Sequence, residues 1–461
     1  MADKHTAPEG AKKPNILMRI LALLVTAALV LGALALVVYR DRFNLDALKR
    51  YLAYRTMETT ETGEAVPFNH AGGNKMSISH LGGGILTASS TGARYYALDG
   101  TLYAEEVLPL ENPVLSASSS TGVVYNAGGQ SLFVFENGQE VSDLSLEEGI
   151  DLLSVRPNDS GWLAITAQQS GYKGAVTVYD SHHQKVISIS LSSTFVVDAA
   201  VSPDCKTVAV VTMDQSGGSF YSRLLFYPVD QSEPSAQVEL GDIVCLDLDY
   251  ESGRVWVLGE DALLIADEKG EAVQSYSFNR SYLKGCDLGG DNFALLLTGP
   301  YRAGSATQAL ILDREGQIVQ TLDLSGQVLD YSAAGNYFAL LTGSALTIYT
   351  STNPEPYALL ENPQGARYVD LSHDGSALLA NTQQAWLYLP NYSVYCIPRR
   401  YPCIFYLTSS LPPFSCSLSG RATKRALCSR CAAFWRSLWP LSGPPSFPTL
   451  WPSPWPRPLS P

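Results

Sequence analysis

The chain has 461 residues, of which 46% are hydrophobic, and a formal net charge of −13 at pH 7. This length exceeds one average domain, and the apolar content is ample for a large core. The charge is uneven, because residues 391–461 contain eight Arg or Lys and no Asp or Glu, which leaves −21 on residues 1–390. So acidic a body argues against nucleic acid as a partner and favours a solvated surface or a basic partner.

The N-terminal region predicts a membrane anchor. Residues 1–19 are polar and basic, and we expect a disordered cytoplasmic segment. Residues 20–39 carry no charge over a length sufficient for a helix to cross a bilayer. No small-residue cleavage site follows, so an uncleaved signal anchor is favoured over a cleaved signal peptide. Basic residues on the two sides nearly cancel, but the commoner arrangement places the following domain outside the cytoplasm, as in a single-pass cell-membrane protein.

Residues 40–63 connect this span to the main domain and contain a short helical pattern. Asn44 can cap the first turn of a helix, and apolar residues then recur at helical spacing. These apolar residues are Leu45, Leu48, Tyr51 and Leu52. The pattern predicts an amphipathic helix over residues 44–55 that lies at the membrane surface or docks under the next domain. A membrane-proximal spacer is favoured, and a partner-binding helix is the alternative.

A repeating unit of about 40 residues organises residues 64–390. Its clearest copy, VVDAAVSPDCKTVAVVTMD at residues 196–214, reads as an alternating strand, a polar turn and a second, continuously apolar strand. A third strand and usually a fourth follow in about eight copies. Four short strands per unit predict an all-β fold, a seven- to eight-bladed β-propeller with eight blades favoured. A two-sheet sandwich is the alternative, and eight in-phase copies disfavour it.

The ends of the repeat region predict how the ring closes. The eighth unit shows three strands before its pattern stops, whereas residues 64–69 (EAVPFN) look like a fourth strand without a unit of its own. A propeller must pair its last blade with its first, because open sheet edges invite aggregation. We therefore expect residues 65–68 to complete the eighth blade and the ring to be finished by residue 390.

Three connections between the second and third strands are longer than the others, at residues 169–174, 214–222 and 299–307. In a propeller these connections share one face with the links between blades. Aromatic and Arg side chains on such a rim are the types that anchor protein interfaces, although long hairpins also tolerate insertions without a function. The sequence predicts a binding surface formed by Tyr172, Phe220, Tyr221, Tyr301 and Arg302.

Residues 391–461 differ in composition from the rest of the chain. They are rich in Pro and Ser and hold five of the eight cysteines and four of the seven tryptophans, without a period. A run of this kind does not form a packed unit, and we expect a disordered, aggregation-prone tail. The abrupt change of composition resembles an out-of-frame translation or a degenerate terminus more than an evolved domain.

No pattern in the chain predicts a catalytic residue, a bound cofactor or a metal site. The six histidines occur in no recognised ligand spacing, and the CxxC of Cys428 and Cys431 lacks two further zinc ligands. The acidic run at residues 247–253 vaguely resembles a calcium loop but lacks the remaining ligand positions. Nucleophile-elbow, P-loop and dinucleotide motifs are missing from the sequence.

The turns in SPDCKTVAVV and SHDGSALLA resemble those of WD40-like and TolB-like propellers. Residues 18–390, including RDRFNLDALKRYLAYR after the span, resemble an uncharacterised bacterial family of single-span membrane proteins with an extracytoplasmic quinoprotein-like, WD40-like propeller. That resemblance implies an architecture and no activity. A protein-binding or assembly module of the cell envelope is favoured. The alternatives are a quinone-dependent oxidoreductase or hydrolase with its site in the funnel, and a sensor of cell-wall fragments.

Overall fold

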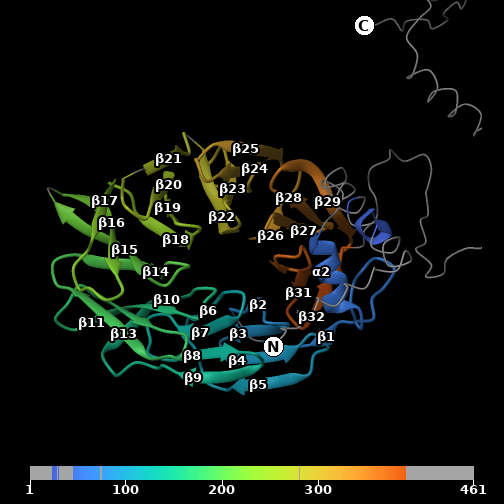
Figure 1. Cartoon of the computed structure of the whole chain (residues 1–461), viewed down its shortest axis with the longest axis horizontal. Coiled ribbons are helices and arrows are strands. Elements are labelled where there is room, and N and C mark those ends of the chain that lie inside the picture. The colour runs from blue at the N-terminus through green and yellow to red at the C-terminus, as the bar shows by residue number, and fades with distance from the viewer. Residues whose placement is uncertain are drawn as a thin grey trace, which may run out of the picture. The chain divides into compact units, whose positions relative to one another are not determined.

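The chain forms a ring of eight antiparallel sheets (Figure 1). This computed structural model describes residues 23–27, 30, 45–72, 75–216, 218–271, 273–279 and 281–390. Each sheet has four strands, so the predicted all-β propeller is confirmed with eight blades. Within the described residues, no helix is both long and apolar enough to cross a membrane. Most of the predicted span and the whole predicted tail, residues 391–461, lie outside the described residues.

The strands of the first four blades follow the chain order. Blade 1 contains β2 (Ser77–Leu81), β3 (Gly84–Ser89), β4 (Gly92–Ala97) and β5 (Leu102–Glu106). Blade 2 contains β6 (Pro113–Ala117), β7 (Thr121–Asn126), β8 (Leu132–Glu136) and β9 (Gln139–Asp143). Blade 3 contains β10 (Ile150–Pro157), β11 (Leu163–Gln169), β12 (Gly174–Tyr179) and β13 (Lys185–Leu191). Blade 4 contains β14 (Phe195–Val201), β15 (Thr207–Ser216), β16 (Ser219–Pro228) and β17 (Ala236–Gly241).

The remaining blades repeat this order, with one exception in the last. Blade 5 contains β18 (Cys245–Glu251), β19 (Arg254–Gly259), β20 (Ala262–Asp267) and β21 (Val273–Ser277). Blade 6 contains β22 (Tyr282–Gly290), β23 (Phe293–Gly299), β24 (Gln308–Asp313) and β25 (Ile318–Asp323). Blade 7 contains β26 (Val328–Ala334), β27 (Tyr337–Thr342), β28 (Ala345–Thr350) and β29 (Asn353–Glu361). Blade 8 contains β30 (Tyr368–Leu371), β31 (Ala377–Ala380), β32 (Gln384–Tyr388) and β1 (Phe68–Asn69).

Blade 8 closes the ring with a strand from the N-terminal side of the propeller. Phe68 and Asn69 of β1 pair with Ala385 and Gln384 of β32, and Glu64 forms a single bridge with Tyr388. The backbone N–H of Ala65 donates to the carbonyl of Leu387 at 2.8 Å. The predicted closure by this segment is therefore observed. With β1 added, blade 8 has four strands, as the other blades do.

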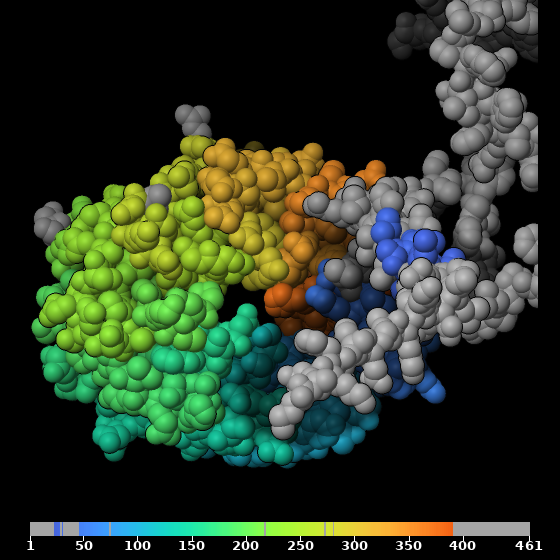
Figure 2. All heavy atoms as spheres, in the orientation of Figure 1, coloured from blue at the N-terminus to red at the C-terminus, as the bar shows by residue number. Residues whose placement is uncertain are grey.

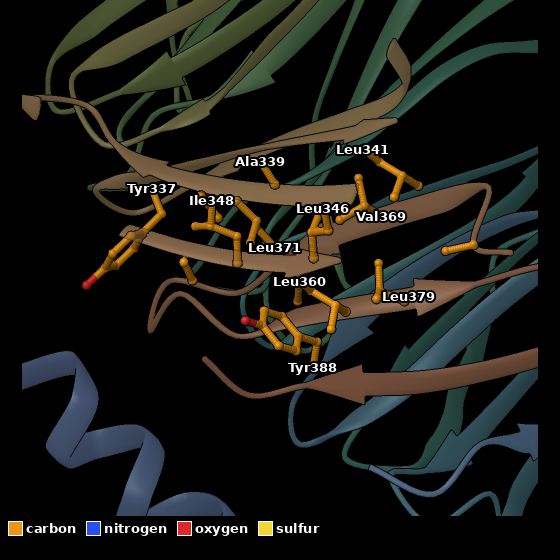
Figure 3. Close-up of a cluster of buried hydrophobic side chains, with 14 of the residues drawn as sticks. Tyr337, Ala339, Leu341, Leu346, Ile348, Leu360, Val369, Leu371, Leu379 and Tyr388 are labelled. Carbon is orange, nitrogen blue, oxygen red and sulfur yellow. The ribbon is translucent and has the colours of Figure 1, made fainter. Parts of the chain in front are cut away.

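The position of a strand in its blade explains its residue pattern. The second strands are buried along almost their whole length, as in β3, because neighbouring blades cover both faces of the sheet. The fourth strands alternate between exposed and half-buried residues, as in β9, because they lie at the rim of the ring. The core consists of apolar layers between blades. Figure 3 shows the layer in which Leu341, Leu346 and Leu360 of blade 7 meet Val369, Leu379 and Tyr388 of blade 8.

The antiparallel order gives the ring two unlike faces. The face that carries the connections between first and second strands, and between third and fourth, is called the turn face. The opposite face, which carries the connections between second and third strands and the links between blades, is called the loop face. Helix α2 (Leu45–Tyr54) precedes the propeller and lies within the segment 44–55 predicted to be helical.

Candidate functional site

The first strands of the blades surround a central channel (Figure 2). A cavity of about 750 Å³ within it extends to the turns of the turn face, including Asn158, Glu251 and Asp374. Its wall is polar and acidic, with Asp249, Asp287 and Asp370 among its lining residues.

Several channel carboxylates join one blade to the next. Asp287 accepts a hydrogen bond from the backbone N–H of Ala333 at 2.8 Å, and Asp330 accepts one from Val369 at 2.8 Å. Asp370 accepts from the N–H of His80 at 2.7 Å, and from the hydroxyl of Ser79 at 3.1 Å. The last pair links blade 8 to blade 1. These carboxylates therefore stabilise contacts between the first strands of neighbouring blades, and Asp287 and Asp370 also line the cavity.

Burial changes the acidity of these groups. Desolvation is the largest cause of the raised pKa of Asp249 and of Asp370, to about 7 in each case. Desolvation likewise raises the pKa of Asp287 and of Asp330 to about 6, against the opposite effect of their backbone hydrogen bonds. A fraction of these carboxyl groups is therefore protonated near neutral pH.

A partly buried ion cluster joins blades 3, 4 and 5. Arg156 contacts both Asp198 and Asp247 through its guanidinium, and its Nε lies 2.8 Å from Asp198 Oδ2. Burial acts to lower the pKa of Arg156, but the two carboxylates raise it overall. These paired charges connect the first strands of three neighbouring blades. Among the described residues, no group of three or more His, Cys, Asp or Glu side chains is arranged to hold a metal ion.

Helix α2 docks on the turn face over blades 7 and 8 (Figure 1). Arg50, only 4% exposed, donates to the carbonyl of Asp374 and, at 2.8 Å, to the hydroxyl of Tyr357. The hydroxyl of Tyr337 points toward α2 in Figure 3 and lies 3.3 Å from Asp46 Oδ2. Gly375 has a φ of 78°, and a Cβ there would lie 3.2 Å from the Arg50 guanidinium, so this turn favours glycine.

The end of α2 reaches the channel. Tyr54 lines the cavity, and its hydroxyl lies 3.4 Å from Nε2 of His80. Desolvation is the largest cause of the raised pKa of Tyr54 and of the lowered pKa of His80, so both groups are neutral at pH 7. The helix therefore borders the mouth of the cavity. No local sequence signal identifies the docking of α2, because Arg50 contacts residues more than 300 positions further along the chain.

The five predicted binding residues all lie on the loop face, away from the cavity mouth and α2. Tyr172, Phe220, Tyr301 and Arg302 are exposed, and Tyr221 is half-buried with the Arg223 guanidinium 4.8 Å from its ring centre. Tyr172, Phe220 and Tyr221 come from the adjacent blades 3 and 4, whereas Tyr301 and Arg302 come from blade 6. The predicted residues therefore form two groups, separated by blade 5.

A contact network that the sequence did not indicate extends the first group. Lys173 Nζ lies 4.9 Å from the ring centre of the exposed Phe195 and 3.7 Å from Asp214 Oδ1. The hydroxyl of Tyr221 donates to Asp214 at 3.1 Å. The sequence could have indicated Phe195, because it is an aromatic residue at the start of a first strand. First strands begin on the loop face.

The loop face also carries a repeated β-bulge on the first strands of blades 3 to 7. Their pairing skips one residue each, and the skipped residues are Leu153, Val197, Leu246, Lys284 and Leu329. A bulge leaves its extra residue outside the regular pairing and redirects it. Leu153, Leu246 and Leu329 are consequently exposed near the loop-face end of the channel. In four of these five strands, two adjacent apolar residues break the strand alternation, and this was the available sequence signal.

The exposed large apolar side chains of the described propeller residues lie mostly on the loop face and on the outer, fourth strands. Eleven lie in the loops or links of the loop face or within the first four residues of the first and third strands, which begin there. They are Val107, Leu108, Leu153, Tyr172, Phe195, Phe220, Val244, Leu246, Tyr282, Tyr301 and Leu329. Among the described residues of the propeller, the connections of the turn face carry none. The described connections of the two faces therefore differ in chemistry, since those of the loop face carry exposed apolar and aromatic side chains and those of the turn face carry none.

Comparison with known proteins identifies the family. The model of a family of unknown function, DUF5711, matches residues 48–358, and the chain belongs to this family. No match was found among curated proteins.

Solved structures show the same fold at low identity. The C-terminal WD40 domain of Sif2 is 10% identical, with a TM-score of 0.51 over 70% of this chain and 97% of that chain. The computationally designed Ika8 protein is 11% identical, with a TM-score of 0.50 over 69% and 97%. The quinohemoprotein alcohol dehydrogenase from Comamonas testosteroni is 10% identical, with a TM-score of 0.49 over 71% and 76%. Identities of this size show similarity of fold alone.

Proposed function

We propose that this member of the DUF5711 family is a membrane-anchored, extracytoplasmic β-propeller that binds a protein partner through its loop face, as an assembly module of the cell envelope. The observation that carries the proposal is the set of exposed apolar and aromatic side chains in the loops and links of the loop face, because the turns of the opposite face carry none among the described residues. Exposed aromatic and apolar side chains that share one face with Arg and Lys are residue types that favour an interaction site. The fold itself suits protein binding, because it offers a broad, rigid platform of loops.

The residue types on the loop face match those of protein interfaces. Tyr172, Phe195, Phe220 and Tyr301 supply exposed aromatic rings, and aromatic side chains contribute a large share of binding energy at interfaces. Lys173 and Arg223 each lie near an aromatic ring of the same surface, so they are held in place before a partner arrives. Side chains ordered in advance lose less conformational entropy on binding.

The place of α2 supports a membrane anchor behind this surface. The uncharged residues 20–39 lie just before α2, and α2 docks on the turn face. An anchor at residues 20–39 would hold the turn face toward the membrane. The loop face would then be turned away from the bilayer, where it is free to meet a partner.

The proposal is tested by exchanging three loop-face side chains and comparing cross-linked partners in native membranes. The test variant combines Tyr172→Ala, Phe220→Ala and Tyr301→Ala. The control combines Val186→Ala, Val273→Ala and Ile318→Ala, which removes three exposed apolar side chains from outer strands. Mass spectrometry identifies what is joined to residues 64–390.

We expect one recurring protein to be cross-linked to the parent chain through the loop face. The test variant should lose it by at least about tenfold, as expected when several aromatic anchors of about 1 kcal/mol or more are removed. The control should keep it, and both variants should unfold at the same denaturant concentration as the parent. A partner profile that is unchanged in the test variant, or no partner above background in the parent, contradicts the proposal.

A further inference from the structure

Helix α2 presents two unlike sides, and the polar side holds the propeller. Asp46, Arg50 and Tyr54 follow one another at intervals of four residues, so they lie on one side of the helix. These are the side chains that contact Tyr337, Tyr357 and His80 of the propeller. The docking of α2 therefore uses charges and hydroxyl groups.

The apolar side of α2 faces solvent. Leu48, Tyr51 and Leu52 lie at i, i+3 and i+4, and their exposed fractions are 52%, 68% and 56%. A surface helix of a soluble domain normally does the opposite, burying its apolar stripe and exposing its polar one. This reversal leaves a three-residue apolar surface on the helix, with the exposed cations Lys49 and Arg55 beside it.

We propose that the apolar side of α2 lies in the interface of the lipid bilayer that residues 20–39 enter, so that α2 joins the turn face to the membrane surface. This inference rests on the membrane anchor of the proposed function. Residues 40–44 alone separate the uncharged run from Leu45, the first residue of α2. Six residue steps span about 20 Å at full extension, so α2 lies close to the point where the chain leaves the bilayer.

The side chains of α2 suit this occupant. Tyr51 carries an apolar ring with a polar end, a type enriched where hydrocarbon meets headgroups. Leu48 and Leu52 supply apolar area for the acyl boundary, and Lys49 and Arg55 can extend their charged ends to lipid phosphates. The buried Arg50 holds the other side of the helix against the propeller. The turn face, and with it the mouth of the channel cavity, would face the membrane.

Photo-cross-linking in native membranes tests this placement on the full chain. The photoreactive residue p-benzoyl-phenylalanine replaces Tyr51 in one variant and Tyr172, which is exposed on the opposite face of the propeller, in the control. After irradiation, mass spectrometry of the peptide that contains each position detects covalently attached phospholipid. Extraction with alkaline carbonate measures separately whether the chain is held in the membrane. Unfolding midpoints equal to that of the parent show that both variants fold.

We expect the chain to stay in the membrane after carbonate, with phospholipid attached at position 51 at least about tenfold more often than at position 172. Retention in the membrane with protein, or nothing, attached at position 51 overturns the inference and leaves the proposed anchor standing. Release of the chain by carbonate overturns the anchor and this inference together. Phospholipid at both positions to the same extent also overturns the inference, because it removes the difference between the two faces.

Discussion

The aspartates of the first strands combine two properties that usually conflict. They are shielded from water, which disfavours the charged carboxylate, and they accept backbone hydrogen bonds from the next blade, which favours it. The raised pKa values show that desolvation is the stronger effect. These residues therefore support the ring through hydrogen bonding, while their ionisation weakens it. Substitutions that separate acceptor from charge can measure each contribution.

Asp370 is the residue at which this separation is most informative, because it joins blade 8 to blade 1. Asp370→Asn keeps an acceptor oxygen for the N–H of His80 and removes the charge, whereas Asp370→Ala leaves that donor without its partner. We expect the Ala variant to be less stable than the Asn variant by about 1–3 kcal/mol, the usual cost of an unsatisfied buried donor. Urea unfolding followed by circular dichroism measures the difference.

Asp249 provides the matched control for this comparison. Burial also raises its pKa to about 7, but no described hydrogen bond joins it to a neighbouring blade. Asp249→Asn and Asp249→Ala should therefore have free energies of unfolding within about 0.5 kcal/mol of each other, as expected away from special contacts. If the Ala and Asn variants of Asp370 were equally stable, the hydrogen bond to His80 would not contribute to closure.

The same groups predict an unusual dependence of stability on pH. An unfolded Asp titrates near 3.9, whereas Asp249 and Asp370 titrate at about 7 in the folded chain. Between these values the folded state binds more protons than the unfolded state, so stability falls as pH rises through this window. We expect a higher urea midpoint at pH 6.5 than at pH 8.5. Asp249→Asn should reduce the difference, because it removes one of the responsible groups.

The half-buried His80 acts in the opposite direction, which bears on the range of the pH experiment. Its pKa is lowered in the fold, so it contributes stability that is lost as pH falls below its unfolded value of about 6.5. Between pH 6.5 and 8.5 the contribution of His80 is small, because an unfolded histidine is at most about half protonated in this range. A midpoint that rises with pH across this range, with no effect of Asp249→Asn, would show that these carboxyl groups are ionised in the fold.

At the scale of one element, α2 shows what sequence periodicity can and cannot predict. The spacing of Leu48, Tyr51 and Leu52 identified a helix and its apolar stripe, and a helix is observed at residues 45–54. The docking side could not be predicted, because Arg50 contacts Asp374 and Tyr357, more than 300 residues away. Periodicity records which residues are alike. It does not record which of them find a partner in another part of the chain.

Arg50 is expected to hold α2 on the propeller. Arg50→Ala removes both hydrogen bonds from the guanidinium and its position 5.9 Å from the Tyr357 ring centre. Undocked, a ten-residue helix is too short to be stable in water, so its amides should exchange freely. We expect amide hydrogen exchange at residues 45–54 to accelerate by at least about tenfold, with little change in β2–β32. Mass spectrometry of deuterium uptake makes the measurement.

Lys49→Ala is the control for Arg50→Ala, because Lys49 lies on the same helix turn with its side chain 73% exposed. Its contact with Asp46 is a surface ion pair of small energetic value. Exchange in α2 should therefore stay within about twofold of the parent chain. Acceleration of the same size in both variants would mean that the intrinsic helix propensity, and not the docking contacts, keeps α2 ordered.

At the scale of the whole molecule, the repeat was sufficient to predict the ring and its closure, but the channel was less accessible to prediction. Repeated copies of a four-strand pattern favour a ring. Because the eighth copy has three strands, its fourth must come from another part of the chain. The roles of the first-strand aspartates depend on their hydrogen bonds to neighbouring blades. Asp370 meets Ser79, for example, across 291 residues of chain. A pattern within one repeat does not show contacts between two repeats.

The borrowed strand leads to a prediction about the whole ring. A chain of residues 58–390 keeps the segment that pairs with β32, including the bridges of Ala65 to Thr59 and of Glu64 to Tyr388. A chain of residues 70–390 lacks it and leaves β32 as an open edge. Both chains lack α2 and residues 391–461, so the two differ in the closing segment alone.

We expect the 58–390 chain to be monomeric and to unfold cooperatively, since all eight blades keep their four strands. The 70–390 chain should unfold at a lower urea concentration and aggregate, because an unpaired strand edge exposes backbone donors and acceptors to other chains. The apolar contacts of Phe68 with Tyr96, whose ring centres lie 5.5 Å apart, are lost as well. Sedimentation velocity and urea unfolding make the comparison. Equal stability and a monomeric state for both chains would show that blade 8 holds the ring closed through side-chain packing alone, without the N-terminal strand.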